Sequence, residues 1–215
     1  MEHEYSIKEE LDTDWAAQPI ALQRRDGRTM LLLEDPGGEP LNSRLGRPLE
    51  LIEFLRLAIA IAGALGKLHA AGLIHKKIEP ANILTEAATG QVWLTGFGIC
   101  LASHSPRQRQ VPEPLDVIAG TFPYMTPEQT GRMNRSIDSR SDLYAYGVTL
   151  YEMLKGVLPF EATDPMEWLH CHIARQPIPP AERLKGIPEP VSAIIVKLLA
   201  KNADEKYQTA AGGGG

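Results

Sequence analysis

The order of hydrophobic and polar positions predicts a β-hairpin near the start of the chain and a long buried helix after it. Two apolar runs within residues 18–35 flank Asp26-Gly27, and Asp-Gly between such runs is a strong short-range signal for a hairpin. Residues 51–71 are apolar on nearly every side, which is typical of a helix buried on most faces. Gly72 follows in the position where glycine commonly ends a helix.

The rest of the chain predicts short strands followed by a helical half. A second mostly buried helix is predicted over 141–156, and a polar, proline-containing loop over 102–116. The other predicted elements are a short amphipathic helix over 3–11, strands within 73–75, 81–84 and 92–96, and helices over 164–175 and 191–208. Strands that come early and helices that dominate later place the chain in the α+β class.

Composition and charge narrow the classes of function. The 215 residues are 43% hydrophobic and 23% charged, as in ordinary globular domains. The formal net charge of −5 argues against a nucleic-acid partner, because such partners attract basic surfaces. No run of about 18 apolar residues is present. The acidic start also lacks the apolar core of a signal peptide, so we expect a cytoplasmic protein without membrane insertion.

Cysteine and histidine side chains give no ground for a structural metal. Cys100 and Cys171 are far apart in the sequence, and we expect both to be reduced thiols. His170 and His172 flank Cys171 on a predicted helix, where residues two apart point about 200° away from each other. The two imidazoles therefore cannot share one ion, and we expect a solvated helix face there.

Four segments in a fixed order carry the chemistry of the chain. The run "HKKIEPAN" (75–82) is followed by "GFG" (96–98), "TPE" (126–128) and a buried helix that contains Asp142. These segments resemble the catalytic loop, the Asp-Phe-Gly motif, the Ala-Pro-Glu motif and the next helix of the eukaryotic-like Ser/Thr protein kinase superfamily, over residues 51–206. Residues 128–154 also resemble the N-terminal kinase-like domain of bacterial multi-domain sensor kinases.

The resemblance implies a protein-kinase-like fold with two unequal lobes. Residues 1–35 would form a partial small lobe, with the C-helix and two strands. Residues 36–209 would form a mainly α-helical large lobe, and residues 210–215 a flexible glycine tail. No Gly-x-Gly-x-x-Gly loop and no Val-Ala-Ile-Lys strand precede residue 50, so we expect the chain to begin inside the small lobe.

The resemblance also assigns positions to a nucleotide site. Glu4 takes the position of the C-helix glutamate, Leu33 that of the gatekeeper, and Glu34-Asp35 that of the hinge. Asn82 takes the position of the catalytic-loop asparagine, which is a metal ligand in the family. Without the glycine loop and the lysine, we expect poor affinity for ATP at these residues.

Three replacements in the catalytic centre predict that phosphoryl transfer is lost. Lys77 stands where the family has the aspartate that accepts the substrate proton, and a lysine ammonium has no lone pair to do so. Gly96 stands where the family has a metal-binding aspartate, and glycine offers no oxygen ligand from a side chain. Glu79 replaces the loop lysine and would repel the transferring phosphate.

Other residues receive structural roles from the resemblance. His75 braces the catalytic loop, Asp142 accepts backbone N–H groups from it, and Glu128 pairs with Lys206 in place of an arginine. Phe97 and Gly98 complete the motif that begins at Gly96. Thr121 and Thr126 are candidate phosphorylation sites, although a structural role is favoured for both.

Three hypotheses follow from the sequence. The first is a pseudokinase that acts as an interaction module, through the activation segment and the helix at 164–174, on a protein partner or neighbouring signalling modules. The second is an active Ser/Thr protein kinase, for which ATP and magnesium would be cofactors. The third is a truncated product without independent function.

Overall fold

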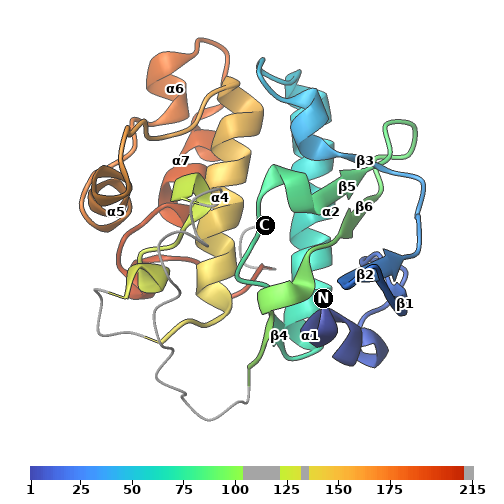
Figure 1. Cartoon of the computed structure of the whole chain (residues 1–215). Coiled ribbons are helices and arrows are strands. Elements are labelled where there is room, and N and C mark those ends of the chain that lie inside the picture. The colour runs from blue at the N-terminus through green and yellow to red at the C-terminus, as the bar shows by residue number, and fades with distance from the viewer. Residues whose placement is uncertain (104–121, 132–135, 211–215) are drawn as a thin grey trace.

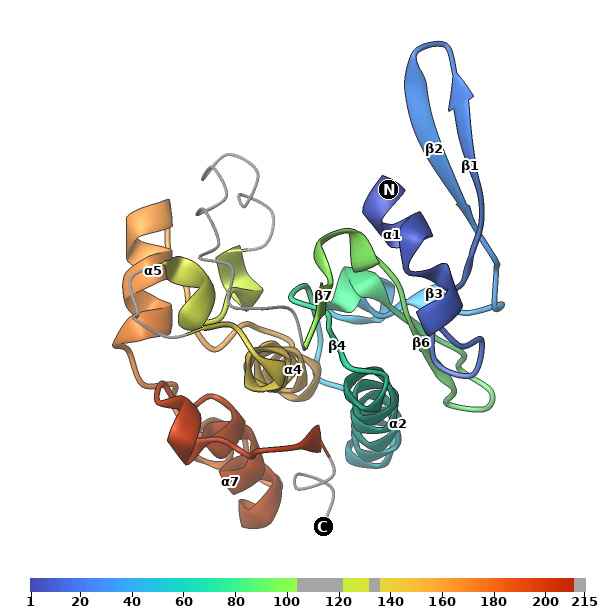
Figure 2. The same ribbon diagram turned by 90° about the horizontal axis from the view of Figure 1, so that it is seen from below.

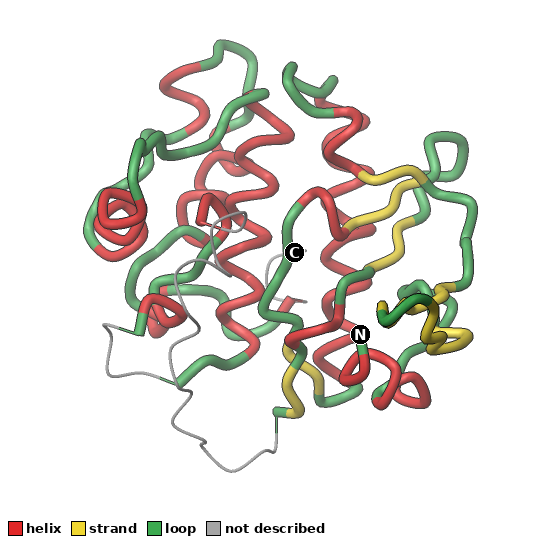
Figure 3. Tube along the Cα trace, viewed as in Figure 1, coloured by secondary structure: helices red, strands yellow, loops and turns green. Residues whose placement is uncertain are grey.

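The chain folds into a strand-containing N-terminal part and a helical remainder. The computed structural model describes residues 1–103, 122–131 and 136–210. Most strands lie on the right of the view with the helix of residues 51–70 against them, and the helices after residue 138 fill the left (Figures 1 and 3), which confirms the α+β class. The helices are α1 (Glu2–Ser6), α2 (Leu51–Ala70), α4 (Ser139–Lys155), α5 (Pro165–Ile173), α6 (Pro180–Arg183) and α7 (Glu189–Leu198). The strands are β1 (Pro19–Arg25), β2 (Arg28–Leu33), β3 (Glu39–Pro40), β4 (Leu73–Ile74), β5 (Ile83–Thr85), β6 (Val92–Leu94) and β7 (Leu101–Ala102).

The predicted hairpin is present as β1 and β2. The strands pair antiparallel, with Leu22 opposite Leu31, and the register shifts between Pro19 and Ala21. Asp26 and Gly27 both have positive φ, 52° and 72°, as a tight primed turn requires. Figure 2 shows the hairpin projecting away from the rest of the fold.

A small sheet in the order β3-β5-β6 positions the candidate catalytic loop. Strands β5 and β6 pair antiparallel with Ile83 opposite Leu94, so Asn82 before β5 and Thr95 after β6 lie at the same end of the sheet. The Thr95 N–H donates to the Asn82 carbonyl at 3.0 Å. The sheet register thus brings the end of the catalytic loop next to Gly96.

Helix α4 lies at the centre of the helical part, between α2 and α7. Thirteen of its 17 residues are buried, as predicted for 141–156. The Tyr146 hydroxyl donates to the Ala58 carbonyl of α2 at 2.8 Å. On the side of α7, a Cβ added to Gly147 would lie 2.7 Å from the Leu198 Cβ, so glycine permits the close approach of the two helices.

Helix α2 departs from the prediction of burial on most faces. Phe54, Leu57, Ile61 and other residues of one face are buried, and Gly72 ends the segment with a φ of 74°. On the opposite face, Ile52 is 76% exposed and Ile59 is 69% exposed. An apolar sequence alone does not tell which face of a helix finds a neighbour.

Two predicted helices are shorter than their patterns suggested. The helix predicted over 3–11 is α1 followed by a 3-10 turn at Lys8–Glu10, an arrangement that places Ile7 and Leu11 in the core. The helix predicted over 191–208 ends at Leu198 in α7. Beyond it the Asn202 side chain accepts the Asp204 N–H at 3.2 Å, a local bond that competes with helix formation.

Some predictions fall on residues that the structure does not describe. Thr121, most of the loop predicted over 102–116 and residues 211–215 of the predicted tail lie outside the described residues. Among the helices of 1–103, 122–131 and 136–210, none combines the length and the apolar character that a bilayer crossing needs.

Candidate functional site

The backbone of the candidate catalytic loop is held by helix α4. The buried Asp142 carboxylate accepts the His75 and Lys76 N–H groups, both at 2.8 Å, and lies 2.9 Å from His69 Nε2. Lys76 adopts a φ of 68°, which is uncommon for a residue with a side chain. Its carbonyl accepts the Gln129 Nε2–H at 2.7 Å. The unusual backbone of Lys76 is therefore held on both sides by residues distant in sequence.

His75 braces the loop in its neutral form. Its Nδ1 accepts the Lys77 N–H at 3.2 Å, so the ring proton resides on Nε2, which donates to the Thr95 carbonyl at 3.0 Å. Burial lowers the pKa of His75, and its ring lies 4.9 Å from that of Phe97, centroid to centroid. Both ring nitrogens of His75 are engaged in these contacts.

Lys77 and Glu79 form a pair next to Asn82. The Lys77 Nζ lies 3.7 Å from the Glu79 Oε1. The Asn82 Nδ2 donates to the Lys77 carbonyl at 3.0 Å and to the Glu79 Oε1 at 3.3 Å. Burial raises the pKa of the Glu79 carboxyl, while the Lys77 ammonium opposes that change. The second oxygen, Oε2, finds no hydrogen-bond partner within the described part of the chain.

The position of Gly96 offers no metal ligand. Its φ is 82°, and a Cβ added there would lie 2.7 Å from the Asn82 Oδ1 and 2.9 Å from the Asn82 Cγ. Within the described ranges, no three His, Cys, Asp or Glu side chains gather as a metal site would require. The residues at this centre therefore do not fit the magnesium that the fold family uses, because Asn82 is the one side-chain ligand of the family pattern that they retain.

Glu4 meets the motif that begins at Gly96 through its backbone. Its buried carboxylate accepts the Phe97 N–H at 3.0 Å, and a Cβ added to Gly98 would lie 3.9 Å from the Glu4 Oε2. Helix α1 thus contacts the 3-10 turn Phe97–Ile99.

The residues assigned to the gatekeeper and hinge lie at the end of the hairpin. Leu33 is half-buried, whereas Glu34 and Asp35 are exposed. The Glu34 N–H donates to the Gln18 carbonyl at 2.8 Å. A small cavity of about 190 Å³ is lined by Glu34 and other residues, none of them from the catalytic loop. The cavity beside Glu34 is therefore separate from the catalytic loop that contains Asn82. The cavity lining is Thr13, Ala16, Ala17, Glu34, Pro36, Gln91 and Trp93.

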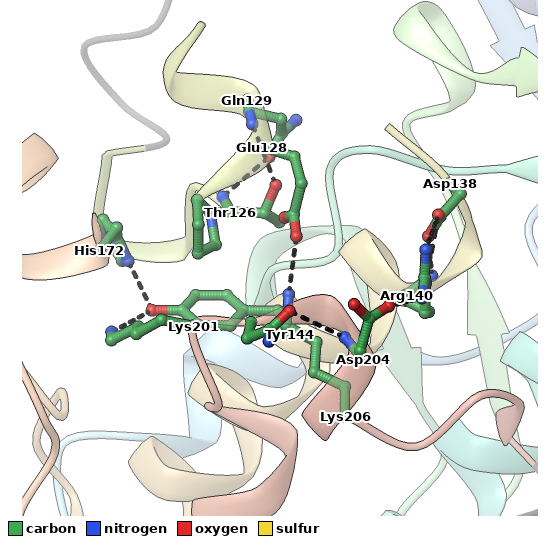
Figure 4. Close-up of polar contacts among 12 residues, drawn as sticks. Thr126, Glu128, Gln129, Asp138, Arg140, Tyr144, His172, Lys201, Asp204 and Lys206 are labelled. Atoms are coloured by element: carbon green, nitrogen blue, oxygen red, sulfur yellow. Dashed lines mark hydrogen bonds and ion pairs between the residues drawn. The ribbon is translucent and has the colours of Figure 1, made fainter. Parts of the chain in front are cut away.

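The "TPE" segment is joined to the C-terminal part by a buried ion pair. The Lys206 Nζ lies 3.1 Å from the Glu128 Oε1, and both side chains are almost fully buried (Figure 4). Burial lowers the pKa of Lys206, which the Glu128 carboxylate partly offsets. Thr126 is buried and its Oγ1 accepts the Gln129 N–H at 3.3 Å, which is a structural use of this hydroxyl.

The prediction of a solvated helix face at His170–His172 was wrong for His172. His172 is fully buried, with its Nε2 2.7 Å from the Phe122 carbonyl and its Nδ1 3.0 Å from the Tyr144 hydroxyl. Lys201 donates to the same hydroxyl at 2.9 Å (Figure 4). Burial lowers the pKa of His172 to about 4. The helical periodicity of α5 does not show which distant residues contact His172, so this network was not predicted. The contact of Gln129 with the Lys76 carbonyl was not predicted either.

Comparisons with known proteins agree with the motifs. Residues 1–211 match the family model described as "Protein kinase domain". The chain is 40% identical over 148 residues to "Serine/threonine-protein kinase PknB" of Mycobacterium leprae, which covers 69% of this chain and 23% of that protein.

Two further relatives extend the match. "Serine/threonine-protein kinase pkn3" of Myxococcus xanthus is 31% identical over 195 residues, covering 87% of this chain and 35% of that protein. "Histidine protein kinase 1" of Candida albicans is 30% identical over 185 residues, covering 79% of this chain and 7% of that protein. The chain thus spans well under two thirds of each relative's length. Because the family model matches residues 1–211 of this chain, the chain belongs to the protein kinase domain family.

Proposed function

We propose that the domain is a pseudokinase-type signalling module, with a kinase fold that presents surfaces to protein partners and does not transfer phosphate. The observation that carries the proposal is the content of the catalytic centre. An ammonium at Lys77 and a glycine at position 96 stand where the reaction needs a proton acceptor and a metal-binding carboxylate.

The surroundings of Lys77 support this proposal. An ammonium has three donors and no lone pair, and the nearby Glu79 carboxylate lies 3.7 Å from the Lys77 Nζ. The Glu79 carboxylate places negative charge where the family uses a lysine to neutralise the transferring phosphate. Three positions of the centre thus act in the same direction.

The intact frame around the centre supports a role in binding. Asp142, Gln129 and the Glu128–Lys206 pair hold the loop and the "TPE" segment in one defined arrangement. Helix α5 packs beside the turn Phe122–Tyr124, which precedes this segment, and leaves Met166 half exposed. We infer that a protein partner or a neighbouring signalling module binds at the end of the activation segment and along α5.

A second candidate is an active ATP-dependent Ser/Thr protein kinase. The names of the PknB and pkn3 relatives favour it, since both are called serine/threonine-protein kinases. Under this hypothesis some other group in the domain would have to take the proton and hold the metal ion.

Phosphotransfer with radiolabelled ATP separates the two candidates. We expect no labelling of the chain or of a generic protein substrate with either Mg²⁺ or Mn²⁺, and no thermal shift with the nucleotide. Lys77→Ala serves as the test variant. Lys67→Ala is its matched control, because Lys67 is a half-exposed lysine on α2. Labelling by the wild type and by Lys67→Ala that disappears in Lys77→Ala would overturn the proposal in favour of the active kinase.

A further inference from the structure

The Asn82 side chain is fixed in an orientation that fills the space beside Gly96. Both hydrogens of its Nδ2 are used, one toward the Lys77 carbonyl at 3.0 Å and one toward the Glu79 Oε1 at 3.3 Å. This leaves the Oδ1 directed at position 96, where it would lie 2.7 Å from an added Cβ. Real side chains do not approach a Cβ so closely, so Asn82 must move before residue 96 can carry a side chain.

We propose that Glu79 is a positioning residue that holds the Asn82 amide across the space of a side chain at position 96, so that the residues at 79 and 96 are coupled. This inference rests on the proposed function, because it explains why position 96 has no room for the metal-binding side chain of the family pattern. The Glu79 carboxylate and the glycine at position 96 then act together through the Asn82 amide.

The surroundings of Glu79 favour this role over that of a passive surface charge. Its side chain is only 11% exposed, and its Oε2 has no hydrogen-bond partner among the residues described. A buried carboxylate oxygen without a partner is unfavourable. The contacts that the Glu79 side chain does make go to the Asn82 amide and to the Lys77 Nζ.

The backbone contact of Asn82 would not fix the amide alone. With the Glu79 carboxylate removed, one hydrogen bond to the Lys77 carbonyl would remain, and the amide could turn away from position 96 by rotating about its side-chain bonds. A carboxylate introduced at position 96 by itself would meet the Asn82 amide before it could act as a ligand.

A thermodynamic cycle in thermal unfolding tests the coupling. Gly96→Ala carries two penalties, the positive φ of 82° and the contact with Asn82, and only the second depends on Glu79. We therefore expect Gly96→Ala to lower Tm by about 5 °C more in the wild type than in a Glu79→Ala background. Equal losses in the two backgrounds, within about 1 °C, would overturn the inference.

The Asn82 amide signals in a nitrogen-15 NMR spectrum give a second readout that does not depend on position 96. We expect Glu79→Ala to speed hydrogen exchange of the Asn82 Nδ2 protons several-fold. Glu79→Gln, which keeps an acceptor oxygen, should restore a rate close to the wild type. The exposed Asn202 amide is the internal control. Unchanged Asn82 exchange in Glu79→Ala would refute the positioning role.

These outcomes are separate from those that test the proposed function. A chain that transfers phosphate would overturn the pseudokinase proposal even if the cycle showed full coupling. An inactive chain without coupling would leave the pseudokinase proposal standing and remove only the role of Glu79.

Discussion

Replacing Asp142 by alanine should destabilise the domain more than any change on the loop that it holds. The carboxylate is fully buried and accepts two backbone N–H groups at 2.8 Å, with His69 Nε2 at 2.9 Å. Alanine would leave all three groups without their acceptor. It would also release Lys76 from the restraint on its positive φ of 68°.

The magnitude follows from the number of bonds lost. A hydrogen bond to a charged group contributes about 1.5–3 kcal/mol, and removing one member of a buried charged set costs about 3–5 kcal/mol. Because bonds to one carboxylate are not additive, we expect a loss of roughly 4 kcal/mol in the free energy of unfolding. That is a large share of the ~5–15 kcal/mol typical of whole domains, and it corresponds to a fall in Tm of about 8–16 °C.

Urea unfolding followed by far-ultraviolet circular dichroism measures this loss, with Tm as a second observable. Asp142→Asn should fall between alanine and the wild type, because its amide oxygen can still accept while its NH₂ faces a donor. Asp14→Ala is the matched control, since the Asp14 side chain is 75% exposed and its ion pair with Lys67 spans 3.7 Å. If Asp142→Ala were no more destabilising than Asp14→Ala, the account of how the loop is held would be wrong. A cooperative transition of the wild type would also argue against a product that cannot fold by itself.

Three further predictions concern the helical part. Lys206→Arg should stabilise the domain by about 1 kcal/mol in urea unfolding. The buried Glu128 Oε2 lacks a partner in the described structure, and a guanidinium offers it a second donor. A loss of stability would contradict this reasoning. The folded state keeps His172 neutral down to its pKa of about 4, whereas the unfolded chain takes up the proton near 6.5. Stability should therefore fall by up to about 3 kcal/mol between pH 6.5 and pH 4, and His172→Gln, measured over the same range, should lose that part of the pH dependence. Gly147→Ala should cost about 1–3 kcal/mol, because its Cβ would lie 2.7 Å from the Leu198 Cβ; a neutral effect on Tm would show that α4 and α7 separate easily.

The parts of the fold that the sequence foretells are those set by local rules. Asp26-Gly27 specifies its hairpin because few residue pairs accept two positive φ values, and the buried helix over 141–156 is apolar on the sides that meet neighbours. The exposed face of α2 and the buried His172 were not predictable in this way. Both depend on which distant element packs against a helix, and periodicity carries no information about that.

The candidate site also has features that the local sequence predicts and features that depend on distant elements. The identities of Lys77, Glu79 and Gly96 are visible in the sequence, and so is their difference from the residues of the family pattern. The orientation of the Asn82 amide depends on the pairing of β5 with β6 and on a carboxylate three residues earlier in the chain. Only coordinates could show that its oxygen occupies the space beside Gly96.

The main-chain anchoring of Lys76 has a consequence for how such a domain changes over time. Its amide and carbonyl are tied to Asp142 and Gln129, so the backbone at Lys76 is held by residues outside the loop. Reactive side chains of the loop can then be replaced while the shape of its backbone is retained. A protein that recognises this backbone shape would still bind after such replacements. An ancestral enzyme could therefore become a scaffold without first unfolding.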